Sequence, residues 1–150
     1  MTVKKIPAKS VLRSSFDLTL AEIPAVAEKT VPALFEEAEK LGLEVAGPVE
    51  FSYIGMDGKP ETTFELIINL PIKKRKKATK NDNGQFKQAR TKPFRCATLE
   101  HIGSISTIPN SYITLNHEMT EAGLKQGDES REVYTHWVAF DSPQNVTEIQ

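Results

Sequence analysis

The chain has 150 residues, 39% of them hydrophobic and 26% charged, which is enough to bury the core of one soluble domain. Its net charge of −1 and pI near 6.3 argue against a protein that binds nucleic acid over most of its surface. The single cysteine excludes an internal disulfide, and no apolar run approaches the ~20 residues that span a bilayer, so we expect a cytoplasmic protein.

The first predicted elements are a strand over residues 9–16 and a long helix. The helical stretch opens at Ile23-Pro24 and stops at Gly42, and Thr30 before Val31-Pro32 is an expected N-cap. Helical spacing predicts one buried apolar face, made of Val31, Leu34, Phe35, Ala38 and Leu41.

Two strands follow, over residues 49–54 and 62–70, and residues 56–60 between them have the composition of a turn. Together they predict a hairpin. In the second strand, alternate residues are expected to face the helices, namely Phe64, Leu66, Ile68 and Leu70. Glu65, Ile67 and Asn69 then point the other way.

The basic run Lys73–Lys80, followed by a turn signal, predicts a solvated connecting loop over residues 73–84. Contact with phosphate is the alternative, but no aromatic residue interrupts the run.

The second half repeats this order. Residues 94–99 read as a strand in which Cys96 is a buried structural thiol. A helix opens at Ile108-Pro109, with Thr107 as its expected cap, and ends at Gly123. Its apolar face is predicted to hold Tyr112, Leu115, Met119 and Ala122. The last two strands are predicted over residues 131–138 and 146–150. In the strand over 131–138, one face is predicted to carry Glu132, Tyr134, His136 and Val138, and the other face Val133, Thr135 and Trp137.

Each half therefore reads strand, helix, strand, strand, with module one over about 8–72 and module two over about 85–150. This duplication predicts an α+β fold with one mostly antiparallel sheet, two helices on one face and a ligand groove at the pseudo-twofold seam.

Motifs for dinucleotides, nucleoside triphosphates and zinc are absent from the sequence, and the three histidines have no metal-ligand spacing, so no cofactor and no metal are expected. Several acidic and aromatic residues lie on the predicted strands: Glu65, Glu132, Glu148, Tyr53, Tyr134 and Trp137. Carboxylates are costly to bury unless paired, and with aromatic walls they attract lipophilic cations. The alternative is that these glutamates pair with Arg13, Arg95 or Arg131, or face water.

Several segments together resemble the GyrI-like domains, also called bacterial transcription activator effector-binding domains. The resemblance covers nearly the whole chain and is carried by Gly47-Pro48-Val49 to Tyr53, Leu70-Pro71-Ile72, residues 94–103, Arg131-Glu132-Val133-Tyr134 and residues 147–150. It implies the duplicated fold described above and a pocket in which Glu132 is the central acid and Tyr134 lies beside it. Ser104-Ile105 stands where the family usually has an aromatic residue, and Gln150 ends the chain before the family's usual Pro-Val.

The resemblance implies a stand-alone protein that binds a hydrophobic or cationic small molecule in sensing or sequestration, as a monomer or dimer. Too few residues precede the first strand for a helix-turn-helix, so direct DNA binding is not expected. Some stand-alone relatives hydrolyse reactive cyclopropane-containing compounds, so the alternative is a hydrolase that uses Glu132 and Tyr134. A protein partner is a further possibility that the resemblance leaves open.

Overall fold

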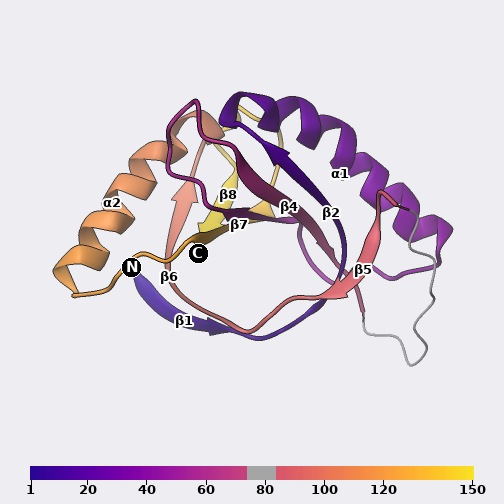
Figure 1. Ribbon diagram of the computed structural model, residues 1–150, viewed down its shortest axis with the longest axis horizontal. Helices are drawn as coiled ribbons and strands as arrows, with labels where there is room; N and C mark the ends of the chain where they lie inside the picture. Colours follow the sequence, from indigo (N-terminus) through magenta and orange to yellow (C-terminus); the bar gives the residue numbers. More distant parts are fainter. Residues whose placement is uncertain (74–83) are drawn as a thin grey trace.

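The computed structural model describes residues 1–73 and 84–150. Its strands form one eight-stranded antiparallel sheet in the order β1-β6-β8-β7-β3-β4-β2-β5 (Figure 1). The strands are β1 (Thr2–Ile6), β2 (Ser10–Leu18), β3 (Glu50–Ile54), β4 (Phe64–Pro71), β5 (Lys87–Arg90), β6 (Phe94–Ile102), β7 (Glu129–His136) and β8 (Val146–Ile149). The helices are α1 (Ile23–Lys40) and α2 (Ile108–Glu121), each preceded by a short 3-10 turn, Leu20–Glu22 and Ile105–Thr107.

Both helices pack on the same face of this sheet. Successive cross-strand neighbours share a face, and one such row runs from Ile68 through Phe51, Glu132 and Ile149 to Leu99. At one end of the row, Ile68 belongs to the core beneath α1, and at the other end, Ile149 and Leu99 belong to the core beneath α2. The fold predicted from the sequence is therefore confirmed, and the seam between its halves passes through β3 and β7.

The sheet also curls strongly. The link between β1 and β2 is only residues 7–9, although six strand spacings separate these strands in the sheet. A flat sheet would place them about 29 Å apart, whereas the link spans at most roughly 14 Å. The β5–β6 link, residues 91–93, crosses between the same two edges. Lys9 and Thr91 join the two links, since each main-chain N–H bonds to the other residue at 2.9 Å. The helices lie outside this curl, and the opposite face of the sheet lines its inside (Figure 1).

Alternation in β4 is confirmed, since Phe64, Leu66, Ile68 and Leu70 are all buried. In α1, Thr30 is not an N-cap, because the helix begins at Ile23 and continues through Pro32. Phe35 is 44% exposed rather than core, because it lies one residue beyond the buried Leu34 on the rim of the apolar stripe.

Other predicted features differ at the ends of elements. Thr107 occupies the N-cap position of α2, but its hydroxyl donates to the Ser104 carbonyl rather than accepting from the helix. The strand predicted over 131–138 ends at His136, so Trp137 and Val138 follow it. The sequence did not predict β1 and β5 as strands. Most of the basic run Lys73–Lys80 lies outside the described residues, but Lys73 pairs with Glu44 at 2.9 Å. Neither α1 nor α2 is long and apolar enough to cross a membrane, and the same holds for every helix in the described ranges.

Candidate functional site

Glu132 is the functional candidate that the fold places most centrally. It lies on β7 in the middle of the sheet, on the face that carries the helices, and only 5% of its surface is exposed. Its cross-strand neighbours are Phe51 on β3 and Ile149 on β8, both buried. A carboxylate in such apolar surroundings is costly unless its oxygens accept hydrogen bonds.

Three phenols supply those hydrogen bonds. The hydroxyl of Tyr134 donates to Glu132 Oε2 at 2.6 Å, and that of Tyr53 donates to the same oxygen at 3.1 Å. The hydroxyl of Tyr112, on α2, donates to Oε1 at 2.7 Å. The chain has only three tyrosines, so all of them converge on this one carboxylate.

The surroundings keep these phenols protonated. Burial, followed by the nearby Glu132 charge, raises the pKa of Tyr53, Tyr112 and Tyr134 well above 10. A neutral phenol donates to a carboxylate, whereas a phenolate would repel it. The three side chains therefore act as fixed donors across the physiological pH range.

Aromatic rings surround the phenols. Phe51 meets Tyr134 edge to face with ring centroids 4.9 Å apart, and Tyr53 meets Phe64 at 6.0 Å. Trp137 meets Tyr134 edge to face with ring centroids 5.6 Å apart, and Trp137 is 49% exposed. One side of the carboxylate thus has an aromatic wall that reaches the surface at Trp137.

No Lys, Arg or His in the described part of the chain pairs with Glu132. Its neighbour in sequence, Arg131, points to the inside of the curl, because successive residues of a strand face opposite ways. There Arg131 Nε donates to Glu129 at 2.6 Å, and its guanidinium stacks on Phe94 at 4.1 Å from the ring centroid. Within residues 1–73 and 84–150, the Glu132 carboxylate is therefore stabilised by hydrogen bonds from phenols and not by an ion pair.

The structure brings together four of the six residues singled out from the sequence, namely Glu132, Tyr134, Tyr53 and Trp137. Glu65 and Glu148 are not among them. By register, Glu65 lies beside Ile54 and Glu148 beside Val133, and both rows face the inside of the curl. Glu148 pairs there with Lys4 at 3.1 Å.

Sequence reasoning missed Tyr112 and Phe51 as parts of the site. Helical spacing predicts Tyr112 in the apolar stripe of the second helix, where it does lie, but spacing alone assigns no role to its hydroxyl. A buried tyrosine hydroxyl usually needs a partner. This need for a partner is the signal that points from the sequence to Tyr112 as a site residue. In the structure the partner is Glu132, so the hydrogen bond joins α2 to β7.

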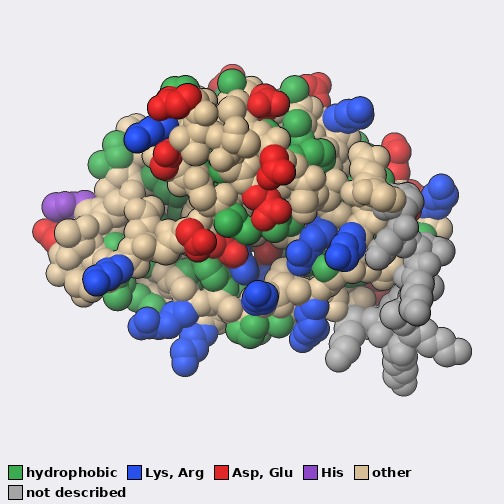
Figure 2. All heavy atoms as spheres, viewed as in Figure 1, with side chains coloured by type: hydrophobic (Ala, Val, Ile, Leu, Met, Phe, Trp, Pro, Cys, Tyr) green, Lys and Arg blue, Asp and Glu red, His purple; other side chains and the backbone are tan. Residues whose placement is uncertain are grey.

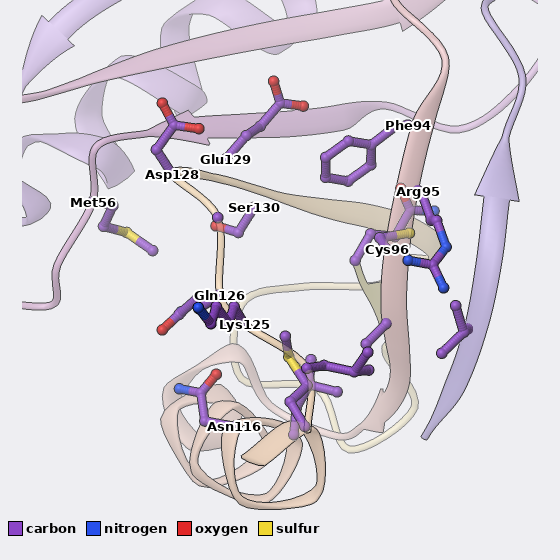
Figure 3. Close-up of a pocket in the computed structure, with 17 residues that line it drawn as sticks. Met56, Phe94, Arg95, Cys96, Asn116, Lys125, Gln126, Asp128, Glu129 and Ser130 are labelled. Carbon is purple, nitrogen blue, oxygen red and sulfur yellow. The ribbon is translucent and has the colours of Figure 1, made fainter. Parts of the chain in front are cut away.

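A cavity of about 220 Å³ has residues next to this cluster in its lining, and Figure 3 shows the side chains that form its wall. It opens where β8 ends between β6 and β7, and its wall includes Ser130, Cys96 and Leu115. Ser130 is the cross-strand neighbour of Tyr53, and Leu115 lies one helical turn after Tyr112 on α2. Burial raises the pKa of Cys96, so its thiol is a poor nucleophile. The cavity therefore lies close to the tyrosine cluster, although Glu132 and the three tyrosines are not part of its lining.

A scan against protein-family models found no match, and no curated protein sequence matches the chain. Solved structures do match, and they show that the chain has the fold of the EcmrR C-terminal domain, in agreement with the GyrI-like fold that the sequence resemblance implies. The C-terminal domain of EcmrR superposes with a TM-score of 0.76 at 20% identity, covering 99% of this chain and 93% of that one. The chain also matches the EcmrR subunit of an EcmrR–DNA complex, with a TM-score of 0.76 at 21% identity. That match covers 99% of this chain but only 55% of the EcmrR chain.

Two more distant structures share this fold. SAV2435 bound to tetraphenylphosphonium has a TM-score of 0.60 at 9% identity, covering 99% of this chain and 90% of that one. A hydrolase encoded by lin2189 from Listeria innocua has a TM-score of 0.61 at 14% identity, covering 98% and 90%.

Proposed function

We propose that this chain binds a hydrophobic small-molecule cation at Glu132. The observation that carries this proposal is a buried carboxylate with three phenol donors and no cationic partner among the described residues. A ligand cation would supply the missing opposite charge. In a poorly solvated site, that interaction is screened much less than at the surface.

The surroundings of Glu132 favour a ligand that is also apolar. Faces of Tyr134 and Trp137 offer cation–π contacts, worth roughly 0.5–2 kcal/mol each. The adjoining cavity adds apolar walls from Leu115, Met119 and Leu124. At about 220 Å³ the cavity is smaller than most ligand pockets, so a bulky cation requires Tyr112 or the start of α2 to move.

Two of the similar structures support the same class of ligand. SAV2435 is a protein of this fold bound to a lipophilic cation, and EcmrR carries the fold in a protein that binds DNA. We infer that the present chain acts in the cytoplasm in sensing or sequestration, without itself contacting DNA through this site.

Tetraphenylphosphonium tests the proposal, with Trp137 fluorescence as the readout because this is the only tryptophan. We expect the cation to quench Trp137 and to bind more tightly than triphenylphosphine oxide, a neutral molecule of similar shape. Glu132→Gln preserves the shape and removes the charge. Affinity for the cation should then fall by about 1–3 kcal/mol, the range for a charge-assisted contact.

Glu65→Gln is the matched control, since it removes the same charge on the other face of the sheet. It should leave affinity unchanged. Equal binding of the cation and the oxide, or equal losses in the two variants, would sink the proposal. A Glu132→Gln variant that loses thermal stability but keeps its affinity would instead make Glu132 a structural residue.

Hydrolysis of a strained electrophile is the second candidate function, because Tyr134 and Glu132 form a short donor–acceptor pair beside a cavity. Glu132 would take a proton from water, the resulting hydroxide would attack the strained carbon, and the phenol would protonate the leaving carbon. The similar structure described as a hydrolase supports testing this. Here Glu132→Gln and Tyr134→Phe should each abolish turnover of a cyclopropane-containing compound while its binding persists.

A further inference from the structure

Positive and negative charges are segregated along the chain. Residues 1–16 contain Lys4, Lys5, Lys9 and Arg13, residues 84–99 contain Lys87, Arg90, Lys92 and Arg95, and neither segment has an Asp or Glu. Acidic residues are concentrated instead in residues 17–65 and 100–148. Although the net charge of the whole chain is −1, residues 1–16 and 84–99 are therefore strongly basic.

The fold brings the two basic segments together. β1 pairs with β6 and β2 pairs with β5, and the links that join them meet at Lys9 and Thr91. Figure 2 shows Lys and Arg side chains along the lower edge of the molecule and most of the visible Asp and Glu side chains above it. Lys4 and Lys9 already pair with Glu148 and Glu50. The exposed remainder has no ion pair with any residue in the described ranges; we call it the basic rim, and it consists of Lys5, Lys87, Arg90, Lys92 and Arg95.

Sheet stability does not explain this arrangement. Lys5 and Arg95 lie directly opposite each other on β1 and β6, and like charges in that position are destabilising. Lysine on an edge strand such as β1 discourages unwanted strand pairing. Arg95, however, is on β6, which is paired on the β1 side and is not an edge.

We propose that the basic rim is a docking surface for an extended acidic segment of a partner polypeptide. β1 is the last strand at its side of the sheet, so the N–H and C=O groups of its outer edge pair with no other strand of the described residues. An extended segment can pair with such an edge, and acidic side chains on it would neutralise Lys5 and Arg95. Of the rim residues, only Arg95 also lines the cavity beneath α2, and the outer edge of β1 lies beyond that cavity wall.

A polypeptide fits the rim better than a nucleic-acid duplex does. The amino group of Met1 pairs with Glu118 of α2 at 3.2 Å, so acidic residues border the start of β1. A duplex has phosphates well beyond the rim, and they would come within the ~8 Å screening length of these carboxylates. A single extended segment stays within the basic area.

A short fluorescein-labelled peptide of alternating Glu and Thr, followed by fluorescence anisotropy, tests the proposal. We expect the peptide to bind the full chain. Its affinity should fall as the salt concentration rises from about 0.05 to about 0.3 M, because salt screens these exposed charges. The variant Lys5→Gln/Arg95→Gln should bind the peptide about threefold to tenfold more weakly, which corresponds to the loss of two exposed ion pairs. The matched control Lys29→Gln/Lys40→Gln removes the same charge from α1 and should bind like the parent.

Removing the Lys5–Arg95 repulsion should leave the melting temperature unchanged or raise it, so weaker binding by that variant will not reflect unfolding. The proposal fails if the parent does not bind the peptide, or if the two variants lose affinity equally. It also fails if a duplex of equal charge binds the rim more tightly than the peptide, which would make the rim a nucleic-acid surface.

Discussion

At the scale of single residues, the central feature is that every tyrosine of the chain donates to one carboxylate. Tyr53 and Tyr134 come from neighbouring strands of the sheet, and Tyr112 comes from the helix above them. Hydrogen bonds to a charged group are worth about 1.5–3 kcal/mol each, more than bonds between neutral groups. The cluster therefore stabilises a buried charge and also ties α2 to β7.

This clustering predicts an unusual alkaline titration. A tyrosine in the unfolded chain titrates near 10, whereas the pKa of each of these three is raised well above it in the folded protein. The folded state therefore retains protons that the unfolded state releases. Their contribution to stability is complete below about pH 10 and is lost as the pH rises through the folded-state pKa values. We expect no phenolate absorbance near pH 10, and then its appearance together with unfolding.

Since the chain has no other tyrosine, the ultraviolet signal reports on this cluster alone. Glu132→Gln removes the charge that opposes phenolate formation, so phenolate should appear at lower pH in that variant. An ordinary titration near 10 in the folded parent would contradict the buried cluster.

At the scale of elements, α1 contains a feature that works against helix formation. Pro32 is exposed in the interior of the helix, where it has no N–H to donate to the carbonyl one turn earlier. Pro32→Ala should raise the free energy of unfolding by about 1–3 kcal/mol, reduced somewhat by the greater freedom of the unfolded chain. Urea denaturation measures the change.

Pro24 is the matched control, because it lies in the first turn of the same helix, where proline is well tolerated. Pro24→Ala should give no gain. If Pro32→Ala destabilises the protein instead, the proline fits a backbone geometry that the helix requires.

The elements also show which features were predictable from the sequence. Strict alternation predicted the buried face of β4, and helical spacing predicted Leu34 and Leu115 as core residues. Short, exposed strands such as β1 carry little hydrophobic pattern, because neither face is buried, so periodicity missed them.

The candidate site was predictable in part for a similar reason. Alternation within one strand shows that Glu132 and Tyr134 share a face. It does not show whether Glu65 and Glu148, on other strands, share it as well. That depends on strand register, which is set by long-range pairing and places both of them inside the curl.

At the scale of the whole molecule, the curl of the sheet depends on two short links that cross between its edges. Lys9 stands in one of them and makes two kinds of contact there. Its main chain bonds Thr91 in the other link, and its ammonium group pairs with Glu50 inside the curl. Glu50 is only 2% exposed, so this ion pair connects the link to the central strand β3.

Breaking this pair from one side should be costly. Lys9→Met leaves the main-chain bonds to Thr91 in place but removes the only ion-pair partner that Glu50 has among the described residues. An uncompensated buried charge typically costs about 3–5 kcal/mol, and we expect a loss of that size in denaturant unfolding. The double variant Lys9→Met/Glu50→Met removes both charges, so it should recover most of the loss, because replacing a buried pair by apolar side chains is often neutral. If the single and double variants lose equal stability, the ammonium group acts through its packing in the link, and the ion pair does not hold the curl together.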